Sequence, residues 1–149
     1  MHGPPKVRSR AFYSRLGGCV RGSASLEGGC ALRLALISEH ASPLAALGGE
    51  DSGGQNVYVA ELARYLGAMG HKVDVFTRRD SKLLSEVVHF DERVRVVNLS
   101  AGPPESVPKD ELFPLMAEFR DAFYRFARRE PAAYDLVHAS FWMSGWVAC

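Results

Sequence analysis

The sequence predicts an α/β fold with a Rossmann-like, mostly parallel sheet flanked by helices. Short apolar runs alternate along the chain with longer segments in which apolar residues recur at helical spacing. A glycine-rich turn containing Gly53 and Gly54 joins the first apolar run to the first helical segment. Chains that alternate in this way form β-α-β units with right-handed crossovers, and these units build a parallel sheet.

The expected strands are short and apolar, and most are bounded by polar or turn-forming residues. A weaker strand is expected at residues 87–90. The clear strands are expected at residues 32–38, 72–77, 94–99 and 135–138.

The first helix is expected to run from the glycine turn to about residue 69. Asp51 and Ser52 are candidate N-caps, and Gly70 is a candidate stop. The apolar stripe of this helix is expected to comprise Val59, Leu62, Ala63, Leu66 and Met69.

A second, longer helix is expected at about residues 112–129. Pro114 is tolerated only in the first turn, so the helix proper begins near Phe113, and Pro131 closes it. Residues 139–146 begin a further element. The stripe of the second helix comprises Leu112, Leu115, Met116, Phe119, Phe123, Phe126 and Ala127.

The composition limits the class of protein. A chain of 149 residues that is 47% hydrophobic can bury one modest core. A net charge of +1 implies neither nucleic acid nor an anionic membrane surface as a partner, and no apolar run reaches the roughly 20 residues of a membrane-spanning helix. Three cysteines without a CxxC pair fit a reducing compartment, so we expect a cytoplasmic protein with no metal site.

Residues 1–30 differ in composition from the rest of the chain. They contain five basic residues, several glycines and serines, and no acid before Glu27. One interpretation is an organellar transit peptide, and the other, which we favour, is a disordered or wrongly extended N-terminus. We therefore exclude this segment from the fold.

The glycine turn is a candidate phosphate site. A glycine-rich turn between a strand and a helix presents unhindered backbone N–H groups at a helix N-terminus, where the helix dipole favours an anion. A Cβ atom at Gly53 or Gly54 would hinder the close approach of a phosphate. Such turns are also common without a ligand, so the glycine spacing alone does not decide whether this turn binds phosphate.

Ligands of open parallel sheets bind outside the carboxyl ends of the strands. His40, Arg78, residues 100–109 and residues 138–142 all follow strand ends and are expected to share one crevice with the glycine turn. Within it, His138 can donate a hydrogen bond to a sugar or leaving group. Lys109 can hold an anionic acceptor, and Phe141 with Trp142 can form a wall for a sugar ring. Each also has an ordinary structural interpretation.

The turn lacks the GxGxxG pattern of dinucleotide-binding folds, and no acid closes the second strand. Arg78 and Arg79 leave an NADP-binding module as an alternative, because they can take a 2′-phosphate. The simpler interpretation is that these two arginines lie at a strand end that is exposed to solvent.

Several separated segments together resemble the N-terminal domain of GT-B retaining glycosyltransferases of family 4. The nearest branch includes sucrose-phosphate synthase and the inositol-phosphate glycosyltransferase of mycothiol synthesis. The resemblance covers about residues 32–148. The segments that carry it are residues 39–43, 51–63, 75–79, 102–103, 107–112, 118–119, 134–138 and 141–145.

The resemblance implies roles for particular residues. Gly53 and Gly54 would lie beside the diphosphate of a nucleotide-sugar donor, and His138 would lie near the transferred sugar. Gln55, Asn56, Lys109 and Trp142 would serve the acceptor, with Lys109 holding its phosphate. In this sequence Ser140 stands where many relatives carry a second histidine or an asparagine.

The resemblance also implies that residues 31–149 form part of an N-terminal, acceptor-side domain and that a C-terminal nucleotide-sugar domain is missing. We therefore expect sugar transfer from a UDP-, GDP- or ADP-sugar to a small acceptor, with no cofactor and no metal, and with this chain inactive alone. A separate C-terminal domain is a possible partner. The alternative is a non-catalytic phosphate- or nucleotide-binding module, either a split-enzyme subunit or a relic.

Overall fold

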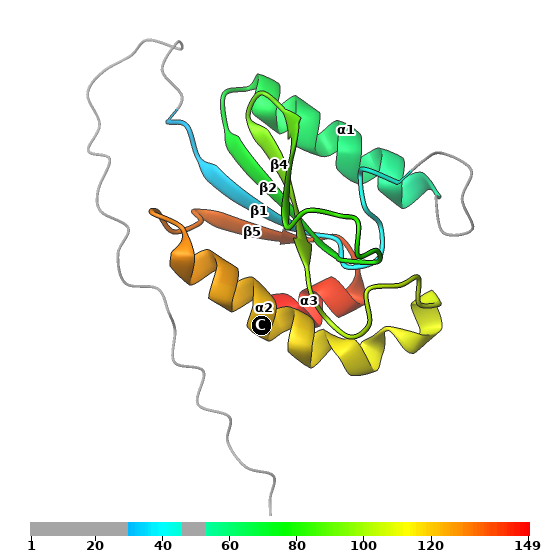
Figure 1. Ribbon diagram of the computed structural model, residues 1–149. Helices are drawn as coiled ribbons and strands as arrows, with labels where there is room; N and C mark the ends of the chain where they lie inside the picture. Colours follow the sequence, from blue (N-terminus) through cyan, green and yellow to red (C-terminus); the bar gives the residue numbers. More distant parts are fainter. Residues whose placement is uncertain (1–29, 46–52) are drawn as a thin grey trace, which may run out of the picture.

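The computed structural model describes residues 30–45 and 53–149. In this part of the chain a five-stranded sheet has the strand order β3-β4-β2-β1-β5, and its pairs are parallel except for β3 with β4 (Figure 1). The strands are β1 (Arg33–Ile37), β2 (Lys72–Arg78), β3 (Val87–Asp91), β4 (Val94–Leu99) and β5 (Leu136–Ala139). The helices are α1 (Gly54–Ala68), α2 (Met116–Arg129) and α3 (Trp142–Ala148), with 3-10 turns η1 (Lys109–Glu111) and η2 (Phe113–Leu115).

The predicted α/β class and the mostly parallel sheet are confirmed. The weak strand at residues 87–90 exists as β3, an antiparallel edge strand with a register shift between His89 and Asp91. The predicted N-terminal extension lies almost wholly outside the described residues, as do the N-cap candidates Asp51 and Ser52.

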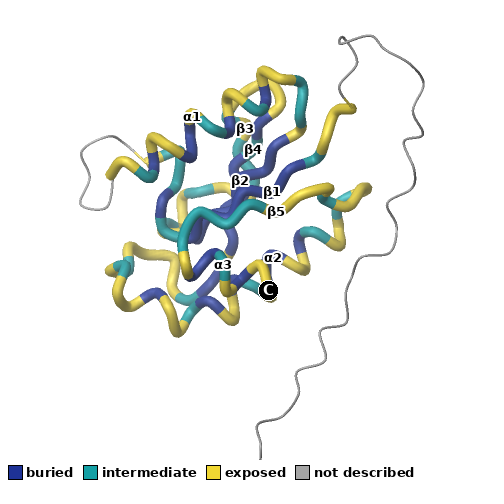
Figure 2. The backbone as a smooth tube through the Cα atoms, turned by 180° about the vertical axis from the view of Figure 1, so that it is seen from behind, coloured by how far each residue is buried: buried dark blue, intermediate teal, exposed yellow. Residues whose placement is uncertain are grey.

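Helices cover both faces of the sheet. Helix α1 packs on one face, while α2 and α3 pack on the other (Figure 1). The central strands β1, β2 and β4 are almost entirely buried, whereas the edge strands β3 and β5 are partly exposed (Figure 2). The α1 side buries Leu34, Leu36, Val59, Ala63, Val73, Val75, Val94 and Val96. The larger cluster on the other side includes Ile37, Phe76, Val97, Leu112, Met116, Phe119, Phe123, Phe126 and Met143.

Helix α1 differs from its predicted form at both ends. Its N-cap is Gly53, and Met69 at the C-cap is 58% exposed instead of packing in the stripe. Gly70 does end the helix, with a φ of 94° that favours glycine. Gly67 is needed for another reason, because a Cβ there would approach Val94 Cγ2 to 2.9 Å.

Helix α2 begins later than predicted. The segment before it forms η1 and η2, with Pro114 inside η2, and the α-helix starts at Met116. A proline has no N–H to donate, so the chain around it adopts short 3-10 turns before regular α-helical bonding begins. Leu112 still reaches the core from this irregular segment, as the stripe predicted.

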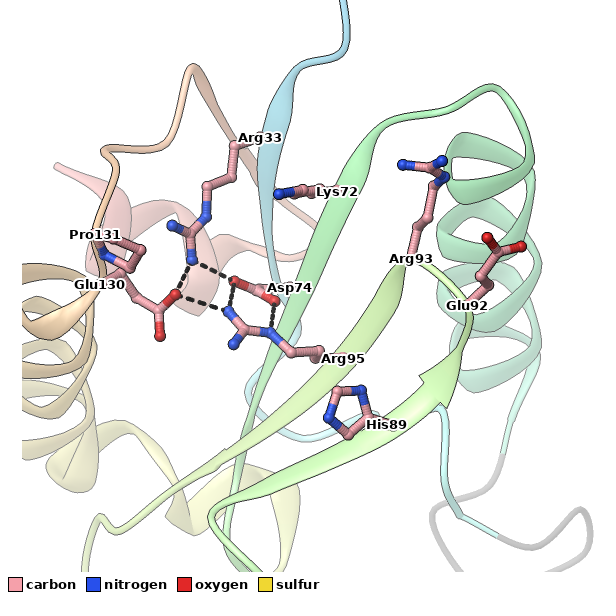
Figure 3. A pocket seen from close by; sticks show the side chains of 9 residues that line it. All are labelled: Arg33, Lys72, Asp74, His89, Glu92, Arg93, Arg95, Glu130 and Pro131. Carbon is pink, nitrogen blue, oxygen red and sulfur yellow. Dashed lines mark hydrogen bonds and ion pairs between the residues drawn. The ribbon is translucent and has the colours of Figure 1, made fainter.

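An ion-pair network fastens the C-terminal end of α2 to the sheet (Figure 3). Arg95 donates two hydrogen bonds to Asp74, of 2.7 and 2.6 Å, and a third to Glu130 at 2.9 Å. Arg33 also bonds both carboxylates, and the Tyr134 hydroxyl donates to Asp74 at 2.6 Å. Since Arg33, Asp74 and Arg95 lie near the amino ends of their strands, this network closes that end of the sheet.

We expect replacement of Asp74 with Asn to lower the free energy of unfolding by about 3 kcal/mol, because it removes the buried one of the two carboxylates that Arg33 and Arg95 share. Urea unfolding measures this change. The exposed pair Glu61–Arg64 on α1 provides the control, and Glu61→Gln should cost less than about 1 kcal/mol. Equal losses in the two variants would contradict a stabilising role for the network.

The same network predicts a pH dependence. Burial disfavours the charged form of Asp74, but hydrogen bonds from Arg95, Tyr134 and Arg33 outweigh it and lower the pKa of Asp74. A carboxyl group with a lowered folded pKa gives its full stabilisation above its unfolded pKa of about 4, and loses it as the pH falls through the folded pKa. Chemical denaturation from pH 7 to pH 2 should therefore show stability falling below about pH 4, and falling less in Asp74→Asn.

Candidate functional site

The site predicted at the carboxyl ends of the strands forms one edge of the structure. β1, β2, β4 and β5 run parallel, so their carboxyl ends meet there, and α1 begins at the same edge (Figure 1). Backbone hydrogen bonds continue past the strand ends: the N–H of Arg78 donates to Glu39 at 3.0 Å, and that of Ser140 donates to Ile37 at 3.0 Å. Residues just beyond the strands are therefore held in register.

Phe141 brings two predicted site residues together at this edge. The Lys109 ammonium lies 4.1 Å from the centre of the Phe141 ring, in a cation–π contact. The imidazole of His40 packs against the same ring edge-on, with ring centres 5.2 Å apart. A cation from η1, a ring from the end of β5 and an imidazole from the end of β1 thus form one cluster.

A buried carboxylate lies behind this cluster. Glu39 is fully buried, and its two oxygens contact His40 Nδ1, at 2.9 Å, and the Ser144 hydroxyl. Burial opposes ionisation, but hydrogen bonds from His40, Ser144 and its own backbone N–H lower the pKa of Glu39. Glu39 is therefore a buried anion that links β1 to α3.

The glycine turn opens α1 without a side-chain cap on Gly53. Asn56 braces this turn: its Oδ1 accepts from the Gly53 N–H at 3.3 Å, and its Nδ2 donates to the Ser42 carbonyl at 2.9 Å. Asn56 is 4% exposed. The sequence interpretation made Asn56 an acceptor ligand, whereas its contacts make it a brace between the turn and the loop after β1.

Neither backbone conformation nor packing requires glycine at positions 53 and 54. Gly53 has an extended backbone with a φ of −104°, and Gly54 is the first residue of the helix. A Cβ built at either position meets no described atom within 4 Å. Gly102 differs, because its φ of 66° and the side chain of Leu115 both exclude a Cβ. The first turn of α1 thus exposes open backbone.

Two buried polar atoms near this edge have no hydrogen-bond partner among the described residues. They are Gln55 Nε2, beside the glycine turn, and Ser140 Oγ, just beyond β5. Asn98 Oδ1, near the end of β4, is a third. Buried polar atoms usually have partners, so unpartnered donors at a predicted ligand site are candidate ligand contacts.

His138 and Trp142 occupy different surroundings. His138 is half-buried and pairs in register with Leu36, which places it on the α1 face of the sheet, the face on which Gly53 also lies. Trp142 is 59% exposed and packs on Phe113 with ring centres 5.2 Å apart. No hydrogen bond between described residues joins His138 to Lys109 or to Gly53. The three residues therefore share only their place at the carboxyl-end edge of the sheet.

Arg78 is not a free strand-end cation. It is 5% exposed, and its guanidinium donates to the carbonyls of Ala101, Pro103 and Glu105, with 2.8 Å to Pro103. Burial lowers its pKa. Arg78 therefore shapes the loop between β4 and η1, and this arrangement removes the reason for assigning a 2′-phosphate to it.

Replacement of Arg78 with Lys should lower the free energy of unfolding by about 1 to 3 kcal/mol, since one ammonium cannot serve carbonyls arranged around a planar fork. Urea unfolding, together with faster amide exchange at Ala101, Gly102 and Glu105, measures the effect. Among the described residues, the side chain of Arg79 donates only to the nearby carbonyls of Ser81 and Lys82, so Arg79→Lys is the matched control. An unchanged loop in Arg78→Lys would contradict the assignment.

A cavity of about 420 Å³ lies at the other end of the sheet (Figure 3). Arg33, Asp74, Arg95 and Glu130 line it, and these side chains already neutralise one another. Because ligands of parallel sheets bind at the carboxyl ends, we place the functional site at the opposite edge.

The sequence interpretation did not include Glu39 and Ser144 in the site. A signal for Glu39 was present, because an acid directly after a fully apolar strand, followed by histidine, is unusual for a solvated loop. Ser144 had no comparable signal, since only the packing of α3 brings it to Glu39.

Comparison with known proteins decides the family. The sequence pattern described as Glycosyltransferase Family 4 matches residues 52–149, which includes the glycine turn, Lys109 and His138. The chain belongs to glycosyltransferase family 4. Its similarity to other members extends over 78% of its length.

The family 4 relatives include bacterial enzymes of two kinds. The chain is 45% identical over 116 residues to D-inositol 3-phosphate glycosyltransferase of Corynebacterium aurimucosum, and 43% identical over 116 residues to that of Corynebacterium glutamicum. It is also similar to the solved structure of sucrose-phosphate synthase from Thermosynechococcus elongatus, with a TM-score of 0.74 and 38% identity. The chain spans 28% of the length of each of these two curated relatives and 29% of the solved chain.

The resemblance to the N-terminal domain of a GT-B glycosyltransferase is thereby confirmed. Within the described residues, no helix is long and apolar enough to cross a membrane.

Proposed function

We propose that this chain forms the acceptor-side part of a site that transfers a sugar from a nucleotide-sugar to a small phosphorylated acceptor. One observation supports this most directly: the open N-terminus of α1 lies at the same edge as the Lys109–Phe141–His40 cluster. The family 4 relatives support the reaction class, since both kinds of relative are named for transfer to, or synthesis of, a phosphorylated small molecule.

In this proposal, the N–H groups at the start of α1 bind the diphosphate of the donor. The helix dipole places partial positive charge at its N-terminus, and the diphosphate gains negative charge as the sugar departs. Donors fixed in advance stabilise such developing charge at little reorganisation cost. Gly53 and Gly54 matter because no Cβ separates the phosphate oxygens from these amides.

Lys109 binds the phosphate of the acceptor. Its ammonium is held against the Phe141 ring at 4.1 Å, so little side-chain freedom remains to be lost when an anion arrives. The inositol phosphate named for the Corynebacterium relatives makes a phosphorylated polyol the first acceptor to test.

The remaining predicted residues take supporting roles. His138 donates a hydrogen bond to the transferred sugar, Gln55 Nε2 to a ligand oxygen, and Trp142 with Phe113 offers an apolar ring surface. The donor is a UDP-, GDP- or ADP-sugar, and no metal or further cofactor is required, because the amides and Lys109 supply the positive charge. A donor domain on a separate chain would complete the site.

The test is to measure binding of the two substrates to the chain, with backbone amide NMR as the readout. We expect Gly54→Ala to weaken binding of UDP-glucose or its ADP or GDP counterpart by about tenfold or more, because its methyl group blocks the phosphate. The same change should not destabilise the fold, since a Cβ at this first helical position meets no described atom and alanine favours helix over glycine. If Gly54→Ala is stably folded but binds the nucleotide-sugar more weakly, then Gly54 acts in ligand binding and not in folding.

Lys109→Met should weaken binding of inositol 3-phosphate about tenfold and leave nucleotide-sugar affinity unchanged. Lys72→Met is the control, because Lys72 is an exposed lysine at the opposite end of the sheet. Affinities equal to wild type in both Gly54→Ala and Lys109→Met would contradict the proposal. Sugar transfer after addition of a separately expressed donor domain of a relative would distinguish a split enzyme from a binding module without catalysis.

A further inference from the structure

The buried carboxylate of Glu39 lies directly behind the imidazole of His40. A fully buried acid is costly unless its hydrogen bonds are satisfied, and Glu39 has no arginine or lysine partner among the described residues. Both of its oxygens are used, one by His40 and one by Ser144. Such a group needs an explanation beyond packing.

We propose that Glu39 is a positioning residue that fixes the tautomer and orientation of His40, so that His40 Nε2 accepts a hydrogen bond from a hydroxyl group of the sugar or polyol ligand. This inference rests on the proposed function for the class of ligand. The geometry of Glu39 and His40 is independent of it.

The first step is the state of the hydrogen bond. The pKa of Glu39 lies below its usual value, so the group is an ionised carboxylate with no proton to donate. The 2.9 Å contact to His40 Nδ1 therefore requires the proton to be on Nδ1. In a neutral imidazole this leaves Nε2 as a hydrogen-bond acceptor.

The second step is the orientation of the ring. Ser144 on α3 donates to the other carboxylate oxygen and so fixes Glu39 from the opposite side. Phe141 packs on His40 at an interplanar angle of 71°, which limits rotation of the imidazole. The His40 side chain remains 10% exposed, so a ligand can still reach it.

The third step is what the neighbouring groups imply about the ligand. The ring of Phe141 contacts both His40 and Lys109, so the acceptor nitrogen and the cation belong to one cluster. A cation binds a phosphate, and a fixed acceptor selects a hydroxyl proton. Together the two favour a ligand that carries phosphate and hydroxyl groups on one small ring.

The direct test is the tautomer of His40 in the full chain. Nitrogen-15 labelling of the five histidines and a long-range proton–nitrogen spectrum at pH 8.5 report which ring nitrogen carries the proton, with His40→Gln used for assignment. We expect a protonated Nδ1 and an unprotonated Nε2. Free imidazole side chains favour the opposite tautomer, so a protonated Nε2 in the wild-type protein would overturn the proposal without any variant.

Variants test the positioning role. Glu39→Met keeps the approximate length of the side chain but removes the acceptor, and we expect His40 to revert to the Nε2-protonated tautomer. Ser144→Ala keeps the Glu39–His40 contact and should retain the wild-type tautomer. Retention of the Nδ1-protonated form in folded Glu39→Met would contradict the assignment to Glu39.

Ligand addition completes the test, with inositol 3-phosphate as the probe. Its binding should shift the Nε2 signal of His40, and Glu39→Met should weaken its binding about tenfold while Lys109 still contributes. If this probe binds, Lys109→Met weakens it and Nε2 does not move, the further inference fails and the proposed function stands. If neither Lys109→Met nor Gly54→Ala changes binding while the Nδ1-protonated tautomer is found, the proposed function fails and only the tautomer is supported.

Discussion

The parallel register of β1 between β2 and β5 is the constraint from which the site follows. Backbone hydrogen bonds do not stop at the last strand residue: Ser38 donates to Phe76 at 2.9 Å, and Arg78 and Ser140 donate to the β1 segment in the same way. The backbone that leads into His40 is therefore held in place as far as Glu39 by bonds to both neighbouring strands. Side chains that follow a buried ladder can be held accurately without a long-range network of their own.

The two ends of the sheet differ in whether their polar groups have partners within the protein. At the amino ends, charged side chains are arranged so that carboxylates and guanidinium groups satisfy one another and hold α2 down. At the carboxyl ends, the first turn of α1 is bare and buried polar atoms of Gln55 and Ser140 lack partners within the described residues. A closed end supports the fold, and an open end leaves interactions for a ligand to complete.

Much of the fold could be predicted from the sequence because it depends on local pattern. The apolar runs fix the strands, and the stripe from Leu112 to Phe126 fixes the face that α2 buries. The start of α2 was misjudged, because Pro114 permits either a first helical turn or a 3-10 segment and only packing decides between them. Met69 fitted the helical period, but the helix ends at Ala68, so Met69 is the C-cap and is exposed.

The sequence predicted at which edge of the sheet the candidate site residues lie, but not most of the contacts that their side chains make. Strand ends identified Lys109, His138 and the glycine turn, because parallel strands bring their ends together whatever their side chains. The partners of Arg78 and Glu39 were not predictable, since carbonyl groups of a loop and the hydroxyl of Ser144 leave no mark in composition or spacing. Asn56 illustrates the difference: it was predicted to contact the acceptor, while its amide bonds Gly53 and Ser42 of the protein itself.

The contact of Gly67 with Val94 has a consequence at the far end of α1. Because Gly67 has no side chain, its backbone packs directly against the side chain of Val94 at the start of β4. Gly54 lies on the same helix, about 20 Å away at 1.5 Å per residue, so a shift of the helix at Gly67 also moves Gly54. A methyl group at position 67 would press on Val94, so the distance between the helix and the sheet depends on a residue that has no side chain.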